Sequence, residues 1–341
     1  MPHAHRRRHA LPPAAVLLLL LAGCATSPVA PVAPEPAPLP VEPAAAVPEP
    51  PPVEPVARPP RAPELVRAEI ALVHDASTPA HAAVAEEIAA SLSPRLYRVT
   101  RFTAAQTAEL EALSERPVTL VTVGADATRA ARAALPTKPL VFCQVPSFGE
   151  AFDAGGPTWG VQTLPPLLLQ LENWQAVDPS LRTIALIVSP SGEAVAAEAR
   201  HAAETLAADL VVETSASDRE TLYLFRRIAT SVDGLWLLPD NDALSPQALR
   251  ELLSYASSRG IGVLTFNDAL LERGALLSAT AVPADVAATV AHVVESVVRG
   301  RTAELPPMSP LSAAALTLNL GLATTLGLPV TEQRWIARDP D

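Results

Sequence analysis

Cysteine is almost absent from this sequence: among 341 residues there are two, Cys24 and Cys143. Two cysteines, one of them close to the amino terminus, cannot form the disulfide framework on which many small exported domains depend. Cys143 lies in the apolar run PLVFCQV. We therefore interpret it as a small buried hydrophobic residue rather than a nucleophile.

Aromatic residues and positive charge are also scarce. Aromatic residues make up 4% of the chain, so few side chains are present to stack against an aromatic ligand. The formal net charge is −11, and the only basic cluster lies near the amino terminus, at residues 6–8. This charge balance excludes an extended nucleic-acid-binding surface.

The motifs of common enzymes are missing as well. The stretch VSPSGEA (188–194) could form a strand, a turn and a helix, but it lacks the G-x-S-x-G frame of a nucleophile elbow. The stretch GADAT (124–128) lacks the lysine and the glycine spacing of a phosphate-binding loop. The histidines do not have the spacing of a metal site; they include His74, His81, His201 and His292. We expect no catalytic residues, no metal and no cofactor.

The amino terminus has the pattern of an export signal. Three arginines precede a short apolar segment, residues 14–21, which is too short to span a bilayer. Leu21-Ala22-Gly23-Cys24 resembles the lipobox of bacterial lipoproteins. That resemblance implies cleavage after residue 23 and lipidation of Cys24, and acyl chains in pairs form a stable membrane anchor. An ordinary signal peptide with an incidental cysteine is the alternative. By the sorting tendency of Gram-negative lipoproteins, which this motif resembles, Ala25 in the place of aspartate favours the outer over the inner membrane.

A proline-rich segment follows the cysteine. Residues 24–63 are mostly Pro, Ala, Val and Glu, a composition that favours extended polyproline II and cannot bury a core. At about 3.1 Å per residue, this linker would reach roughly 110 Å when fully extended. We interpret it as a spacer between the membrane and the folded part; a ligand for proline-binding modules is the alternative.

The remaining chain alternates between apolar segments of strand length and alanine-rich helical segments. The apolar segments are 68–74, 118–124, 139–145, 182–189, 209–215, 232–239 and 261–266. Apolar strands that alternate with helices indicate parallel sheets covered on both faces. A break at Gly155-Gly156-Pro157 separates two groups of strands. The predicted fold is α/β, with two doubly wound parallel-sheet lobes joined by a hinge.

Several stretches resemble the ABC-transporter substrate-binding protein family of type 1 periplasmic-binding fold, the group that includes tryptophan-binding lipoproteins. The resemblance is clearest in SVDGLWLLPDNDALSPQALRELLSYASSRGIGVLTFNDALLERGALLSAT (231–280) and extends to 121–142, 160–194 and 316–330. It implies a first lobe of residues 65–158 plus 277–330, a second lobe of 159–276, and a polar tail at 331–341.

The resemblance also implies a ligand held between the lobes by turns at the carboxyl ends of strands. Helix N-termini at such turns are suited to a carboxylate. The candidate residues, each of which has a helix cap as its alternative role, are Asp75, Ser77, Gly124, Asp126 and Gln144 in the first lobe and Ser189, Ser191, Asp240, Asn241 and Asn267 in the second. Asp240-Asn241 falls on the family's Asp-Asn turn.

The chain departs from the family pattern at some positions. Val145-Pro146 stands where the family tends to have Asp-Pro, and Val282, Pro283 and Ala287 replace an Asp-Tyr pair and a glycine. Because acidic and aromatic groups expected from the family are missing, the resemblance is a weaker argument that this chain binds the family's amino-acid ligand.

Two functions follow from this sequence. The first is a lipid-anchored periplasmic protein that binds an amino-acid-like solute or a small carboxylate for an ABC-type permease. The alternative is an envelope lipoprotein that uses the same fold as an interaction or sensing module, for example to regulate a cell-wall synthase.

Overall fold

The structure is a computed structural model that describes residues 67–145, 156–239, 244–329 and 334–338. The predicted signal peptide, Cys24 and the proline-rich linker lie outside these residues, as do Asp240 and Asn241. No helix in the described ranges is long and apolar enough to cross a bilayer.

The first sheet consists of parallel strands in the order β11-β5-β4-β3-β1-β2. Every residue of β3 is buried, because helices cover both faces of the sheet. The strands are β1 (Ala68–His74), β2 (Tyr97–Thr103), β3 (Val118–Val123), β4 (Leu140–Cys143), β5 (Thr158–Val161) and β11 (Met308–Ser309).

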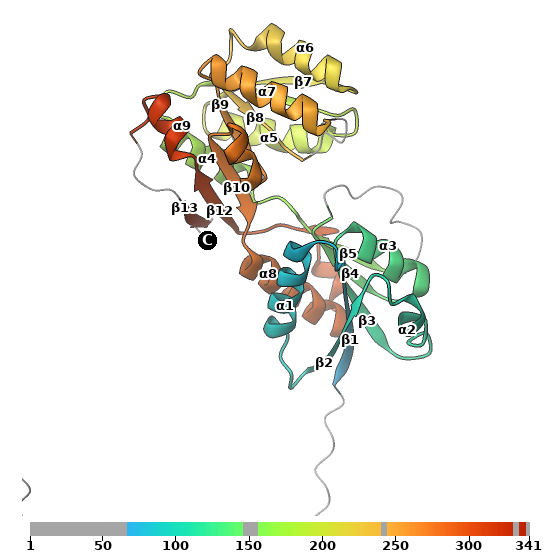
Figure 1. Ribbon diagram of the computed structural model, residues 1–341. Coiled ribbons are helices and arrows are strands. Elements are labelled where there is room, and N and C mark those ends of the chain that lie inside the picture. Colours follow the sequence, from blue (N-terminus) through green and yellow to red (C-terminus); the bar gives the residue numbers. More distant parts are fainter. Residues whose placement is uncertain (1–66, 146–155, 240–243, 330–333, 339–341) are drawn as a thin grey trace, which may run out of the picture. The chain divides into compact units, whose positions relative to one another are not determined.

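Helices pack on both faces of the first sheet (Figure 1). On one face, α1 (Pro79–Ser91) and α8 (Pro283–Val298) contribute side chains such as Ile88 and Val290 to the core. On the other face, α2 (Thr107–Glu111) and α3 (Ala125–Ala134) contribute Leu110 and Ala131. Cys143 is buried in the core on the α1–α8 face, as the sequence predicted, and burial raises the pKa of its thiol to about 12.

The second sheet has the order β13-β12-β10-β9-β8-β6-β7. Its strands β6 to β10 are parallel, whereas β12 and β13 add to the edge in antiparallel fashion. The strands are β6 (Thr183–Val188), β7 (Asp209–Thr214), β8 (Gly234–Trp236), β9 (Gly262–Thr265), β10 (Leu277–Ala281), β12 (Ala313–Leu318) and β13 (Arg334–Arg338).

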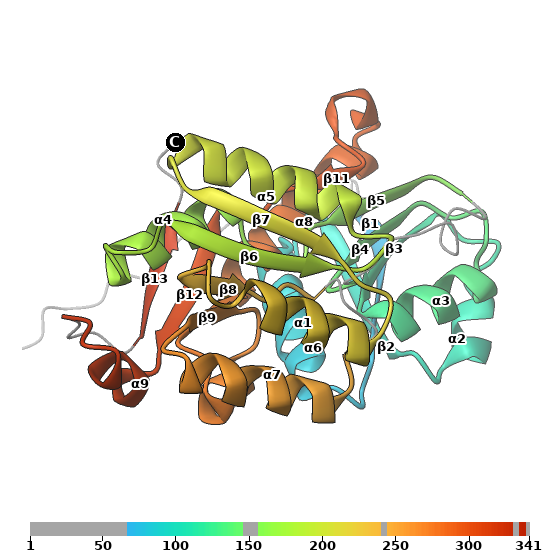
Figure 2. The same ribbon diagram turned by 90° about the horizontal axis from the view of Figure 1, so that it is seen from above.

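Helices also cover both faces of the second sheet. Figure 2 shows α5 (Glu193–Thr205) on one side of β6 and β7, with α6 (Asp218–Ile228) and α7 (Pro246–Ser258) on the other. Helix α4 (Leu167–Val177) packs on the α5 face, where the fully buried Trp174 fills the space beside Gly234. Shorter helices complete the described chain: η2 (Asp268–Arg273), η3 (Thr302–Glu304) and α9 (Leu320–Thr325).

The two sheets share one strand order. In the first sheet β2-β1-β3-β4-β5 and in the second sheet β7-β6-β8-β9-β10 follow the same doubly wound path, in which the chain starts next to the edge, adds the edge strand and then reverses direction. The predicted fold class, α/β with two doubly wound parallel-sheet lobes, is therefore confirmed.

The predicted lobe boundaries are wrong in part. Strand β5 belongs to the first sheet, although residues 159–276 were assigned to the second lobe. Conversely, β10 and β12 belong to the second sheet, although 277–330 were assigned to the first. Within 277–330, α8 and β11 lie with the first sheet. The predicted polar tail contains β13, which pairs with β12. Apolar strands of both sheets have the same residue pattern, so the pattern does not say which sheet a strand joins.

The chain passes between the two sheets at three connections within the described residues. The first connection, 162–166, leads from β5 to α4, and the second, Val282, leads from β10 to α8. The third, 310–312, leads from β11 to β12.

Candidate functional site

Each sheet has one position where neighbouring strands lead in opposite directions across the sheet. In the first sheet this switch point lies between β1 and β3, and in the second it lies between β6 and β8. Loops that leave the carboxyl ends of strands diverge at such a point, and open α/β sheets bind their ligands there. The turns after these four strands therefore form the candidate site.

Asp75 follows β1 and organises the turn into α1. Its carboxylate accepts hydrogen bonds from the Ser77 backbone N–H (2.9 Å), the Ser77 hydroxyl (2.8 Å) and the Thr78 hydroxyl (3.2 Å). The bond from the Ser77 backbone N–H makes the largest contribution to lowering the pKa of the Asp75 carboxyl, which is consequently ionised. Ser77 is therefore held by Asp75, and the pair presents a negative charge at the end of β1.

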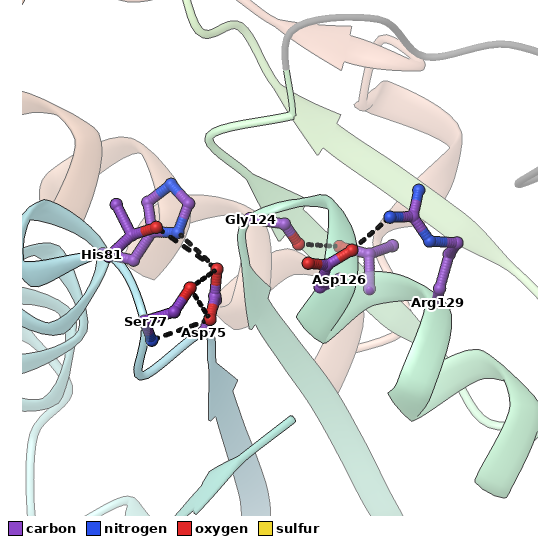
Figure 3. A network of polar contacts seen from close by, with 8 residues as sticks. Asp75, Ser77, His81, Gly124, Asp126 and Arg129 are labelled. Atoms are coloured by element: carbon purple, nitrogen blue, oxygen red, sulfur yellow. Dashed lines mark hydrogen bonds and ion pairs between the residues drawn. The ribbon is translucent and has the colours of Figure 1, made fainter. Parts of the chain in front are cut away.

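Gly124 follows β3 and begins α3. Its φ of 94° and ψ of 158° lie in a region that is essentially restricted to glycine. The imidazole of His81, from the first turn of α1, lies against this glycine, because a Cβ placed on Gly124 would be 2.6 Å from its Cε1 and Nδ1 atoms. The Nδ1 atom of His81 is 3.9 Å from the Asp75 carboxylate. His81 thus joins the turns that follow β1 and β3 (Figure 3).

Two further predicted residues lie at this edge. Asp126, in the first turn of α3, is exposed and forms an ion pair with Arg129 (Figure 3). Gln144 directly follows β4 and adopts a positive φ of 57°, which is uncommon for a residue other than glycine. The backbone N–H of Gly124 donates to the carbonyl of Cys143, so the turns after β3 and β4 are adjacent.

The first-sheet edge contains groups that can bind a charged ligand. The N-terminus of α3 has no side-chain cap within the described residues, so its first N–H groups can receive an anion. Asp75 and Asp126 can attract a cation, and His81 contributes an imidazole beside both turns. Among the described residues no group of three or more His, Cys, Asp or Glu side chains could hold a metal ion.

Serine and asparagine side chains follow strands at the carboxyl edge of the second sheet. Ser189 and Ser191 follow β6, and their hydroxyls are 2.8 Å apart. Asn267 follows β9 and accepts a hydrogen bond from the Ala269 backbone N–H, so it has the alternative role of a helix cap. Asp240 and Asn241, which follow β8, lie outside the described residues.

The structure brings Asp75, Ser77, Gly124, Asp126 and Gln144 together at one edge of the first sheet. It places Ser189, Ser191 and Asn267 at the corresponding edge of the second. From the sequence, His81 is tested only for metal-site spacing, and its contact with Gly124 is not predicted. The sequence places His81 near the start of a helix that follows a strand-end aspartate, but this position alone does not indicate a contact with Gly124.

The pH dependence of stability gives a test of the His81 contact. Burial lowers the pKa of His81, with Asp75 and Asp126 opposing this effect and His74 adding to it. Below the ordinary histidine pKa of about 6.5 the unfolded chain binds this proton more readily than the folded chain. This contribution therefore reduces stability as the pH falls from about 7 to about 5. In His81→Gln the loss of stability should be smaller, as measured by urea unfolding across this range; an unchanged slope would contradict the half-buried, neutral imidazole.

Comparison with known families gives a match over more than half of the chain. A model of the family described as ABC transporter substrate binding protein matches residues 103–337. No curated protein matches the chain.

Solved structures with the same fold share little sequence with the chain. A domain from Streptococcus pneumoniae in complex with L-Trp has 18% identity and a TM-score of 0.52, covering 78% of this chain and 96% of that one. A conserved domain protein from Vibrio cholerae has 19% identity and a TM-score of 0.51 at the same coverage. A ligand-free, open substrate-binding protein with adhesive properties from Clostridium difficile has 13% identity and a TM-score of 0.58, again at 78% and 96% coverage.

Proposed function

Because this chain belongs to the ABC transporter substrate-binding protein family, we propose that it binds an amino-acid-like solute or a small carboxylate for an ABC-type uptake system. The observation that carries this proposal is the shared strand order of the two sheets. It gives each sheet a switch point with polar turns at its carboxyl edge: Asp75 and Gly124 in the first, Ser189 and Ser191 in the second. A solute held by both edges would draw the lobes together.

The chemistry of the first edge supports a small charged solute. The uncapped N-terminus of α3 suits a carboxylate, and the ionised Asp75 suits an ammonium group. Asp240 and Asn241 are proposed to contribute from the second edge.

An aromatic amino acid fits less well, although the Streptococcus pneumoniae neighbour holds L-Trp. Val282 and Ala287, two of the residues that depart from the family pattern, are buried at 6% and 0% exposure. Ala287 packs in the core of the first lobe and Val282 packs beside β12, so neither side chain replaces the missing polar and aromatic groups. We therefore expect no strong binding of tryptophan or tyrosine.

The proposal includes a lipid anchor. Cys24 is proposed to carry the acyl chains, the proline-rich linker to act as spacer, and the folded part to face the periplasm, with the outer membrane favoured. The support is the motif Leu21-Ala22-Gly23-Cys24 and the composition of residues 24–63.

A thermal-shift screen of amino acids and small carboxylates tests the binding function. At a hundredfold excess of solute over its dissociation constant, binding stabilises the folded chain by about 2.7 kcal/mol. This gain should raise the melting temperature by several degrees for at least one solute.

Asp75→Asn keeps an oxygen that can accept the turn hydrogen bonds but removes the charge, and it should lose most of the shift. Asp178→Asn is a matched control, because Asp178 makes the same kind of turn with Ser180, accepting from its backbone N–H (3.0 Å) and hydroxyl (2.6 Å). Asp240→Ala combined with Asn241→Ala should abolish the shift. If both Asp75→Asn and this double variant kept the wild-type shift in melting temperature, the solute would bind elsewhere.

The outer face of α6 and α7 favours the interaction module as a second candidate. A groove of about 440 Å³ lies between these helices and is lined by residues that include Tyr223, Arg226 and Glu251. Tyr223 is 62% exposed, and the guanidinium of Arg227 lies 6.0 Å from its ring centroid. Exposed tyrosine and arginine are enriched at protein interfaces. If no solute shifts the melting temperature and Tyr223→Ala abolishes binding of an identified envelope protein, this second function replaces the first.

A further inference from the structure

The three connections between the sheets are held together unequally. A buried side chain joins the second connection to the third. Among the described contacts, the first connection is joined to the β11 segment, which precedes the third connection, by backbone hydrogen bonds alone. Motion between the lobes must bend all three connections, so their mutual attachment determines how the lobes move.

Asp285 is the side chain that joins the second and third connections. It lies in the first turn of α8, directly after the second connection, and is 9% exposed. Its carboxylate accepts hydrogen bonds from the Ser312 backbone N–H (2.8 Å), the Ala313 backbone N–H (3.0 Å) and the Ser312 hydroxyl (2.6 Å). Hydrogen bonds to an ionised acceptor are stronger than those between neutral groups.

These bonds continue the pairing of β10 with β12 past the end of the sheet. The antiparallel ladder ends where Ala281 pairs with Ala314. Beyond that point, Val282 packs with Ala313 and Ala315 in a small apolar cluster, and Asp285 then binds residues 312 and 313. A strand of the second sheet is thus fastened to a helix of the first lobe.

The first connection lacks such a fastening. Its Gln162 backbone N–H donates to the carbonyl of Ser309 at 2.9 Å, which extends the short pairing of β5 with β11. A cavity of about 140 Å³ lies beside it, lined by residues that include Gln162, Thr163 and Met308. The Thr163 hydroxyl is buried without a hydrogen-bond partner among the described residues. This looser packing leaves the first connection room to adjust.

We propose that Asp285 is a positioning residue that makes the second and third connections move as a single hinge element. The lobes then bend about this fastened pair, and the first connection follows. The proposal rests on the proposed function in one respect, since closure on a solute is the motion that this hinge would guide.

The test measures the hinge without any solute. Spin labels on Glu87→Cys in α1 and Ser254→Cys in α7, both exposed positions, report the distance distribution between the lobes by pulsed electron resonance. The full-length chain carries Cys24→Ala, and Cys143 stays in place because its buried thiol does not react. Hydrogen exchange at the Ser312 and Ala313 amides reports directly on the bonds to Asp285.

In Asp285→Ala, exchange at these amides should accelerate by about tenfold or more, the factor expected for losing a hydrogen bond to a charged group. Asp285→Asn keeps one acceptor oxygen but loses the charge, so its acceleration should be smaller. The distance distribution should broaden. Asp218→Ala is the matched control, because Asp218 also lies in the first turn of a helix and accepts a backbone N–H, that of Ser245 at 2.9 Å, but lies in α6, away from the connections. It should leave the distribution unchanged.

Ser312→Ala removes only the hydroxyl bond and should broaden the distribution to a smaller extent, so the proposal stays testable even if Asp285→Ala does not fold. A wild-type distribution in Ser312→Ala and in whichever Asp285 variant folds would overturn the proposal, as would unchanged amide exchange in a folded Asp285→Ala. Because no solute is present, these results are independent of whether the solute screen succeeds.

Discussion

Replacing Gly124 with valine is expected to abolish solute binding and to destabilise the folded chain by about 2–5 kcal/mol. Two effects add. The backbone of Gly124, with φ of 94° and ψ of 158°, is strained for any residue with a Cβ, and that Cβ would be 2.6 Å from the imidazole of His81. The imidazole would have to leave its place between the turns after β1 and β3. Urea unfolding and the thermal-shift screen measure the two losses.

Gly300→Val separates the two effects. Gly300 has a φ of 69°, but no atom lies within 4 Å of a Cβ placed on it. This control should show backbone strain alone, of about 1–3 kcal/mol, with solute binding intact. Combining Gly124→Val with His81→Ala should recover part of the stability by removing the clash. If Gly124→Val were as stable as the wild type and bound solute normally, the account of this turn would be incorrect.

Replacing Cys24 with alanine is expected to leave the chain uncleaved by lipoprotein signal peptidase. Essentially all of the protein should then lack acyl chains and leave the detergent phase in which lipoproteins collect. Acyl chains on this cysteine would be the membrane attachment proposed for the chain, and paired acyl chains bind a bilayer stably. Residues 28–63 have a composition that offers no apolar alternative. Cell fractionation and labelling with a radioactive fatty acid measure the effect.

Cys143→Ala is the matched control for this experiment. Cys143 is the other cysteine of the chain and is fully buried in the first lobe, so its replacement should leave both the label and the membrane location unchanged. A wild-type chain that takes up no fatty acid, or a Cys24→Ala chain that keeps the label, would disprove lipidation at Cys24.

Much of the fold could be predicted from the sequence because parallel strands buried on both faces are apolar throughout. The stretches VTLVTV and TIALIV became β3 and β6 for this reason. The lobe boundaries could not be predicted in the same way. The sheet that a strand joins depends on its pairing partners, such as Leu318 for Leu277 in the pair of β10 with β12. The composition of a strand does not indicate its partner, so the sheet of β10, β12 and β13 could not be predicted. The two-residue strand β11 is too short to leave a pattern.

The candidate site was predictable where it depends on strand ends. Asp75 and Gly124 come directly after apolar strands, so their place at the carboxyl edge follows from the alternation of strands and helices. His81 was not predictable, because its contact with Gly124 exists only once α1 and α3 start side by side at the switch point. Asp285 was missed for the same reason: its partners, Ser312 and Ala313, lie 27 and 28 residues further along the chain.

The central claim is that a solute binds at the carboxyl edges of both sheets, and amide chemical-shift mapping tests it most directly. Labelled protein is titrated with the solute that gives the largest thermal shift. The account predicts saturable changes at the amides of Ser77, Gly124 and Gln144 in the first lobe and of Ser191 and Asn267 in the second. Changes confined to other surfaces, such as the α6–α7 groove around Tyr223, with these five amides unaffected, would contradict it.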